Sequence, residues 1–132
     1  MPSAAPSAAV PRVLVIDDGL TMRLFYRNVL EAAGFRVEEA ANGAEGYEKT
    51  LAEPFDLLIV DVNMPKMDGY SMLRLVRRDS NVHGVPAVMI STEAEPADAA
   101  RAYAAGANYY LVKPVAPDRL VEVARLMTGG SA

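Results

Sequence analysis

The sequence lacks cysteine altogether, and it has neither a long apolar run nor an excess of basic residues. Without cysteine the chain forms no disulfide and carries out no thiolate chemistry, which is compatible with a reducing cytoplasm. No apolar run approaches the roughly 20 residues of a membrane helix, which argues against membrane insertion. The 13 basic and 17 acidic residues give a net charge of −4, and this balance argues against a nucleic-acid partner, which requires a basic face.

The composition of the chain indicates one domain with a short segment at either end. Residues 1–10 are rich in Pro, Ala and Ser and lack the basic and apolar regions of a secretory signal, so we expect a flexible tail there. Two adjacent glycines predict that residues 128–132 fray at the other end. The remaining residues, 11–127, are long enough for one domain, and 52% hydrophobic residues in the whole chain supply a full core.

Five short apolar runs alternate with helical patterns along the chain. The runs cover residues 12–16, 35–40, 57–60, 87–90 and 109–112. Three of the runs are nearly all apolar, which is typical of parallel strands buried on both faces. Residues 35–40 include Arg36 and Glu38, which suits a strand at the edge of the sheet.

Between the runs, apolar residues recur at helical spacing. The first three stripes are Met22, Tyr26, Val29 and Ala33; Ala44, Tyr47 and Leu51; and Tyr70, Leu73 and Val76. Pro96 and Pro117 begin the fourth and fifth helices, Gly34 and Gly106 end the first and fourth, and Asn42 caps the second. Five strand–helix units in this length predict a three-layer α/β fold, with a parallel five-stranded sheet between two layers of helices.

Polar residues stand at the ends of four of the apolar runs: Asp17 and Asp18, Asp61, Ser91, and Lys113. The ends of parallel strands meet at one edge of an open sheet, where ligands bind, so we expect these side chains to lie together. Three neighbouring carboxylates repel one another, and a hard divalent cation removes that conflict. Mg²⁺ fits best, with Mn²⁺ as a possible substitute. The alternative is that Asp17 and Asp18 only cap the first helix.

Carboxylates, a metal and an ammonium group together suit nucleophilic attack on phosphorus, which yields an aspartyl phosphate. Asp61 is the best nucleophile because it ends the central run. Lys113 and the metal would neutralise charge on the transferring group. The Ser91 hydroxyl can donate to a phosphoryl oxygen, although it could instead cap the following turn.

Four motifs occur in a fixed order: Val15-Ile-Asp-Asp18, Asp61-Val-Asn-Met-Pro-Lys-Met-Asp-Gly69, Ile90-Ser-Thr-Glu-Ala94 and Val112-Lys-Pro114. Together they resemble the receiver domain of two-component response regulators, and the resemblance covers about residues 11–127. It is strongest to the single-domain chemotaxis regulator of the CheY type. The resemblance implies the flavodoxin-like (βα)5 fold, with the strand order 2-1-3-4-5.

The resemblance also implies a role for each residue of the site. Asp61 would accept phosphoryl from a sensor histidine kinase or a histidine phosphotransfer protein. Asp18, Asp61 and the backbone carbonyl of Asn63 would bind the metal directly, and Asp17 would bind it through water. Ser91 and Lys113 would contact the phosphoryl group, and Tyr110 would act as the switch aromatic.

Three further positions follow from the resemblance as tuning residues for the lifetime of the phosphoryl group: Asn63, Thr92 and Glu93. Thr92 stands where a smaller residue is frequent, so its bulk is expected to slow access to the phosphoryl group. The peptide bond before Pro114 is expected to be cis.

Phosphorylation adds negative charge and strong acceptors, which can bias a two-state surface. We expect this surface at residues 96–125, from Pro96 to Arg125, where a downstream target would bind. The alanine-rich helix there suits low local stability or simply close packing. We predict a signalling protein rather than an enzyme, with self-catalysed phosphorylation and dephosphorylation as accessory reactions.

Two other functions share some of these features. A small Mg²⁺-dependent phosphohydrolase of the haloacid dehalogenase kind also uses an aspartyl phosphate, but it would carry a second aspartate where this chain has Asn63. A flavin-binding domain of the same fold is disfavoured because the acidic loop after the first strand would repel the flavin phosphate.

Overall fold

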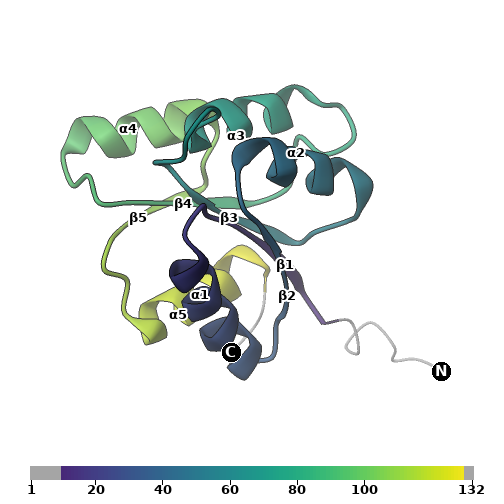
Figure 1. The fold of residues 1–132 in the computed structure, drawn as a ribbon, viewed down its shortest axis with the longest axis vertical. Helices are drawn as coiled ribbons and strands as arrows, with labels where there is room; N and C mark the ends of the chain where they lie inside the picture. The colour runs from purple at the N-terminus through teal and green to yellow at the C-terminus, as the bar shows by residue number, and fades with distance from the viewer. Residues whose placement is uncertain (1–9, 130–132) are drawn as a thin grey trace.

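The computed structural model describes residues 10–129, and within them five parallel strands form one sheet (Figure 1). The strands are β1 (Arg12–Ile16), β2 (Arg36–Ala40), β3 (Leu57–Asp61), β4 (Ala87–Ser91) and β5 (Tyr109–Val112). Their spatial order is β2-β1-β3-β4-β5, which confirms the predicted fold. Residues 1–9 and 130–132 lie outside the described part, so the predicted tail and most of the predicted frayed end lie there too.

Helices cover both faces of the sheet, as Figure 1 shows. One face carries α1 (Leu20–Ala32) and α5 (Pro117–Met127), and the other carries α2 (Gly43–Ala52), α3 (Gly69–Arg78) and α4 (Pro96–Ala105). Because alternate residues of a strand point to opposite faces, each sheet face has its own core. Val13, Val15, Leu57 and Ile59 belong to the core beneath α1 and α5, while Leu14, Ile16, Leu58 and Val60 belong to the other.

Most of the predicted elements are present, with small shifts at their ends. β3 and β4 each extend one residue further than the predicted runs, to Asp61 and Ser91, because pairing with the neighbouring strand continues through those residues. β2 lies at the edge of the sheet as predicted, and Asn42 caps α2 by accepting a hydrogen bond from the backbone N–H of Glu45. Gly34, at φ +99°, follows the end of α1.

Of the three residues of the predicted apolar stripe of α2, Tyr47 packs against the core, whereas Ala44 and Leu51 do not. Ala44 is exposed and Leu51 is 46% exposed, whereas α2 buries Gly43, Gly46 and Thr50. The reason is close backbone packing, since a Cβ on Gly46 would lie 2.9 Å from Cδ1 of Ile16 in β1. A pattern of apolar side chains cannot reveal a helix that packs through its glycines.

The helix α4 is held mainly at its C-terminal end. Its buried residues are Ala102 and Ala105, both small. From α3, the guanidinium of Arg77 donates to the carbonyl of Gly106 at 2.8 Å and 3.0 Å, and to Oδ1 of Asn108 at 3.0 Å. Gly106 has φ +113°, and a Cβ there would lie 2.6 Å from the Arg77 side chain, so glycine is required by conformation and by space.

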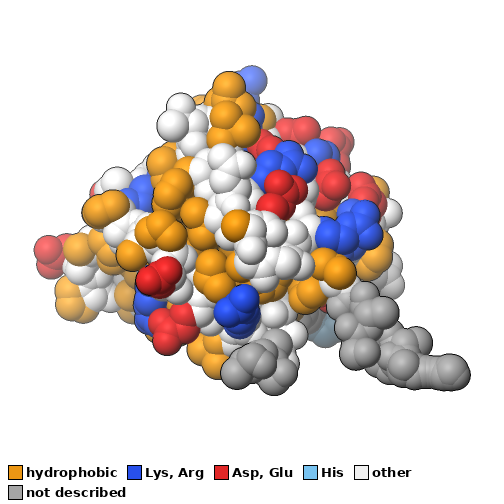
Figure 2. Space-filling model, turned by 90° about the horizontal axis from the view of Figure 1, so that it is seen from below, with side chains coloured by type: hydrophobic (Ala, Val, Ile, Leu, Met, Phe, Trp, Pro, Cys, Tyr) orange, Lys and Arg blue, Asp and Glu red, His pale blue; other side chains and the backbone are white. Residues whose placement is uncertain are grey.

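The face formed by α1 and α5 mixes hydrophobic and charged side chains (Figure 2). Its large exposed hydrophobic residues include Leu20, Leu24 and Leu126. Among the helices of residues 10–129, none has the length and apolar character to cross a membrane.

Candidate functional site

The acidic residues predicted at the strand ends meet at one edge of the sheet. Asp17 follows β1 directly, and Asp61 ends the neighbouring strand β3. One carboxylate oxygen from each of Asp17, Asp18 and Asp61 lies within 4.8 Å of the other two. Asp17 and Asp61 are buried and Asp18 is exposed, so the cluster opens to solvent on one side.

Lys113, which follows β5, brings the positive charge of the site. Its Nζ lies 3.1 Å from Oδ1 of Asp61 and 3.8 Å from Oδ2 of Asp17. The backbone of Lys113 donates to the carbonyl of Ser91 at 2.7 Å, which ties it to the end of β4. The peptide bond between Lys113 and Pro114 is cis.

The electrostatics of the cluster favour a bound cation. Burial raises the pKa of both Asp17 and Asp61, and the charge of Asp17 raises the pKa of Asp61 further. Lys113 opposes both shifts without cancelling them. The two buried carboxylates therefore hold more negative charge than one ammonium group balances.

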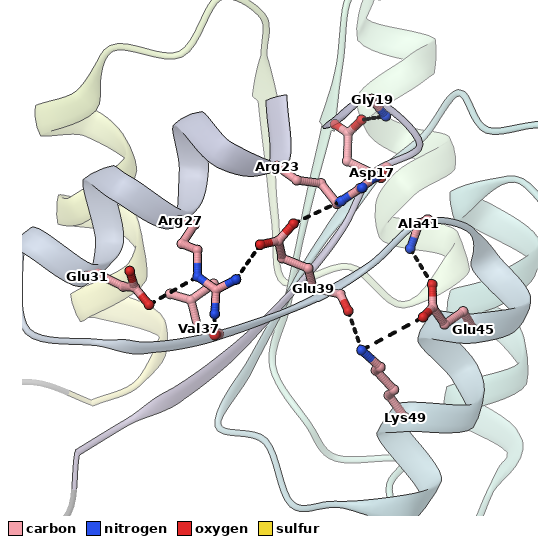
Figure 3. A network of polar contacts seen from close by, with 10 residues as sticks. All are labelled: Asp17, Gly19, Arg23, Arg27, Glu31, Val37, Glu39, Ala41, Glu45 and Lys49. Atoms are coloured by element: carbon pink, nitrogen blue, oxygen red, sulfur yellow. Dashed lines mark hydrogen bonds and ion pairs between the residues drawn. The ribbon is translucent and has the colours of Figure 1, made fainter. Parts of the chain in front are cut away.

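Two neighbours, Gly19 and Arg23, hold Asp17 in place (Figure 3). Its Oδ1 accepts a hydrogen bond from the backbone N–H of Gly19 at 2.8 Å, and its carbonyl accepts one from Arg23 at 2.8 Å. Arg23 in turn pairs with Glu39 of β2 at 3.0 Å, and Glu39 also pairs with Arg27. These contacts leave Oδ2 of Asp17 as the oxygen that faces the site.

The residues present fit a hard divalent metal. Oδ2 of Asp17 and Oδ1 of Asp61 are buried, and within the described residues the ammonium group of Lys113, at 3.8 Å and 3.1 Å, is the polar group that faces both of them. Buried oxygens of this kind are costly unless a partner satisfies them. Carboxylate oxygens grouped in this way are the ligands that Mg²⁺ and Mn²⁺ prefer. The alternative that Asp17 and Asp18 only cap the first helix is wrong, because the N-cap of α1 is Gly19 and no side chain caps that helix.

Ser91 and Tyr110 converge on the same residue, Glu93. Ser91 is fully buried, and its Oγ accepts a hydrogen bond from the backbone N–H of Glu93 at 3.1 Å. The hydroxyl of Tyr110, from β5, donates to the carbonyl of Glu93 at 2.6 Å. The turn after β4 is therefore bonded to both predicted switch residues, and Ser91 caps that turn in this structure.

Both the sequence and the fold of this chain match those of known proteins. The sequence profile of the response regulator receiver domain matches residues 13–125. The chain belongs to the response regulator receiver family. Receiver domains of this family act in two-component signalling, and they are signalling domains rather than enzymes in the usual sense.

Relatives of this receiver domain include chemotaxis proteins. The chain is 40% identical over 120 residues to chemotaxis protein CheY1 of Helicobacter pylori, covering 89% of this chain and 97% of that protein. It is 40% identical over 109 residues to the gliding motility regulatory protein of Myxococcus xanthus, covering 83% of this chain but only 14% of that longer protein.

Solved structures resemble the receiver domain equally well. Chemotaxis protein CheY4 of Vibrio cholerae superposes with a TM-score of 0.86 at 36% identity, over 90% of this chain and 99% of that one. A CheY-like receiver domain protein of Methanospirillum hungatei gives a TM-score of 0.84 at 29% identity, over 92% of this chain and 95% of that one.

The remaining predicted residues of the receiver domain lie on the open rim of the site. Asn63, Thr92 and Glu93 are exposed, and Asn63 and Glu93 line a shallow hollow. Sequence reasoning missed another residue of this hollow, Arg101 of α4, whose guanidinium lies 4.2 Å from the ring centre of Tyr70 in α3. An arginine in an alanine-rich helix gives no signal of such a contact, because its partner is 31 positions away in sequence.

Proposed function

We propose that this receiver domain accepts a phosphoryl group on Asp61 from a sensor histidine kinase or a histidine phosphotransfer protein. One observation carries the proposal: Nζ of Lys113 lies 3.1 Å from Asp61, in a cluster where two further carboxylates lie within 4.8 Å. This set of groups suits the transfer of a phosphoryl group to a carboxylate.

The chemistry of the transfer follows from the residues. A carboxylate oxygen of Asp61 forms a bond to phosphorus as the P–N bond of the donor's phosphohistidine breaks, and the electron pair of that bond leaves with the imidazole nitrogen. Lys113 pairs with a phosphoryl oxygen and so neutralises part of its charge. Burial of Asp61 excludes most of the water that would compete as a nucleophile or hydrolyse the product.

Asp17, Asp18, Asp61 and the backbone carbonyl of Asn63 would hold Mg²⁺, or Mn²⁺ in its place. When bound, the ion would supply the positive charge that the cluster lacks and would neutralise charge on the phosphoryl oxygens. Asn63, Thr92 and Glu93, which are exposed on the rim, are placed to control the access of water to the phosphoryl group. They therefore set its lifetime.

The phosphoryl group would then change the surface at residues 96–125, from Pro96 to Arg125. Ser91 leaves the backbone N–H of Glu93 to donate to the phosphoryl group, and the turn that Tyr110 also holds is released. The helix α4 follows this turn and buries two alanines, so a small free energy is enough to move it.

A downstream target that binds this surface completes the signalling pathway. The similarity to CheY proteins favours a stand-alone regulator in chemotaxis, with another two-component phosphorelay as the alternative. A cytoplasmic location is part of the proposal, since a kinase and a target of this kind would act there. A phosphohydrolase is less well supported, since the position two residues after Asp61 is the exposed amide Asn63 rather than a second acid.

Intact mass spectrometry after incubation with acetyl phosphate and Mg²⁺ tests the phosphoacceptor. We expect one added phosphoryl group, which is absent from the Asp61→Asn variant and from a sample with the metal removed. The Asp56→Asn variant, which changes an acid just before β3, serves as the matched control and keeps the adduct. An adduct on Asp61→Asn, or none on the parent protein even after rapid quenching, contradicts the proposal.

Amide hydrogen exchange tests the switch. Binding of the phosphoryl analogue beryllofluoride should change exchange within residues 96–125 and leave β1 and β2 unchanged. If exchange in residues 96–125 stays the same while the analogue is bound, the coupling between the site and this surface is refuted.

A further inference from the structure

Three buried side-chain polar atoms in residues 10–129 have no hydrogen-bond partner: Oδ2 of Asp17, Oδ1 of Asp61 and the hydroxyl of Tyr26. The first two belong to the acidic site. The third comes from the middle of α1, and neither the receiver motifs nor the proposed mechanism assigns it a role. Tyr26 is 1% exposed, so water from the surface does not satisfy its hydroxyl.

The strand geometry places Tyr26 on the same side of the sheet as the two carboxylates. Tyr26 packs in the core beneath α1 together with Val15 of β1 and Ile59 of β3, which are paired neighbours in the sheet. Side chains two residues apart on a strand share a face, so Asp17 and Asp61 continue the rows of Val15 and Ile59. The phenol ring therefore fills the layer that ends in the two carboxylates.

The electrostatics of Tyr26 agree with this placement. Burial raises the pKa of the Tyr26 hydroxyl, and the charges of Asp17 and Asp61 raise it further. At neutral pH the phenol is thus uncharged, and it can donate one hydrogen bond and accept another.

A buried hydroxyl without a partner is unfavourable, and a phenylalanine would fill the same space without that cost. The Tyr26 hydroxyl has no partner in residues 10–129, and Oδ2 of Asp17 and Oδ1 of Asp61 share one ammonium group, that of Lys113, so a further group would satisfy the three atoms together. A hydrated divalent cation does so, because its charge satisfies the carboxylates and its water offers hydrogens to the hydroxyl.

We propose that Tyr26 is a positioning residue of the metal site, whose hydroxyl hydrogen-bonds to the carboxylates and water that surround the bound Mg²⁺ on its buried side. The inference rests on the proposed function, since it requires a metal at the acidic cluster. It adds to the site a residue from α1, which otherwise only covers the sheet.

Isothermal titration with MgCl₂ tests the role of the hydroxyl. The Tyr26→Phe variant removes one oxygen and keeps the ring, so we expect it to bind Mg²⁺ about tenfold more weakly, as is usual when an outer partner of metal ligands is lost. Tyr47→Phe is the matched control, because Tyr47 packs in the core on the opposite face of the sheet, and its affinity should equal that of the parent protein.

The parent titration separates the two ideas. If the parent protein binds Mg²⁺ and Tyr26→Phe binds it equally well, the role of Tyr26 is refuted and the proposed function stands. If the parent protein does not bind Mg²⁺, the metal part of the proposed function fails, and this inference fails with it.

A second measurement does not depend on how well the variant folds. In protein labelled with 3-fluorotyrosine, the fluorine resonance of Tyr26 should shift during the Mg²⁺ titration with the same dissociation constant, while that of Tyr47 stays in place. A Tyr26 resonance that does not respond to saturating Mg²⁺ overturns the proposal.

Discussion

Replacing Asp17 with asparagine should stabilise the metal-free protein. Asparagine keeps the Oδ1 acceptor that the backbone N–H of Gly19 uses, at 2.8 Å. It exchanges the unsatisfied Oδ2 for an amide that can donate to Asp61. The substitution thus removes a buried charge and adds a donor without changing the shape of the side chain.

The size of the effect can be worked from the distances. Two unit charges no more than 4.8 Å apart, as in the acidic cluster, repel by at least about 3 kcal/mol at an effective dielectric constant of about 20. The exposed Asp18 repels Asp17 less than the buried Asp61 does, because water screens it. Nζ of Lys113 lies 3.8 Å from Oδ2 of Asp17, and on the same scale their attraction offsets about 4 kcal/mol of this repulsion.

Burial adds to the cost of the Asp17 charge, and the new amide donor adds to the gain from removing it. Because the repulsion and the attraction nearly cancel on this scale, the gain comes from the burial cost and from the new hydrogen bond, at roughly 1 kcal/mol each. We therefore expect the variant to gain about 2 kcal/mol in its free energy of unfolding at neutral pH. For a domain of this size, that corresponds to an increase in Tm of about 8 °C.

The gain should depend on pH in a defined direction. Burial raises the pKa of Asp17 above its ordinary value of 3.8, so the folded state binds a proton more readily than the unfolded state does. The penalty from the charge is therefore complete at neutral pH, shrinks as the pH falls through the raised pKa, and is gone below 3.8. The variant and the parent protein should accordingly become equally stable in acid.

Urea unfolding followed by far-UV circular dichroism, with EDTA present, measures the effect. Glu48→Gln, which neutralises an exposed acid of α2, serves as the matched control and should change stability by less than about 0.5 kcal/mol. An Asp17→Asn variant that is less stable than the parent protein at neutral pH refutes the view that the cluster is electrostatically strained without metal.

Three further outcomes follow from the packing and the polar contacts. Gly46→Ala should lower the free energy of unfolding by about 1–3 kcal/mol, because its Cβ meets Ile16 at 2.9 Å, whereas Gly84→Ala has open space and should cost little; urea unfolding compares the two. Arg77→Met should cost about 3 kcal/mol in the same assay, since carbonyls that the guanidinium now satisfies are left without a donor. Glu39→Gln should weaken the pairing with Arg23 and lower Tm by a few degrees, and this loss should shrink in high salt.

The sequence predicted the strands and most of the acidic site because both depend on local order along the chain. A buried parallel strand is a short apolar run, and the polar residue that ends it must lie at the common edge of the sheet. Asp17, Asp61 and Lys113 were found in this way. The buried face of α2 was not predicted, because a helix that packs through its glycines shows no periodic pattern of apolar residues.

The role of Tyr26 in the site was missed for a related reason. Its position fits the apolar stripe of α1, and the sequence gives no sign that the far end of its ring carries a hydroxyl into a polar region. Only the register of β1 against β3 brings Tyr26 into the same layer as Asp17 and Asp61. The contact between Arg101 and Tyr70 was missed in the same way, since it joins two different helices across the surface.

The hydrogen bonds from Arg77 to the carbonyl of Gly106 anchor α4 at its C-terminal end. The helix starts beside the site, just after the turn at Glu93, and it ends at the opposite edge of the sheet, where the guanidinium clamps the chain. The C-terminal end of α4 is therefore fixed, and the N-terminal end, near Asp61, is the end that can move. If Asp61 is phosphorylated as proposed, a small displacement of the turn would tilt α4, and the surface nearest Asp61 would move most.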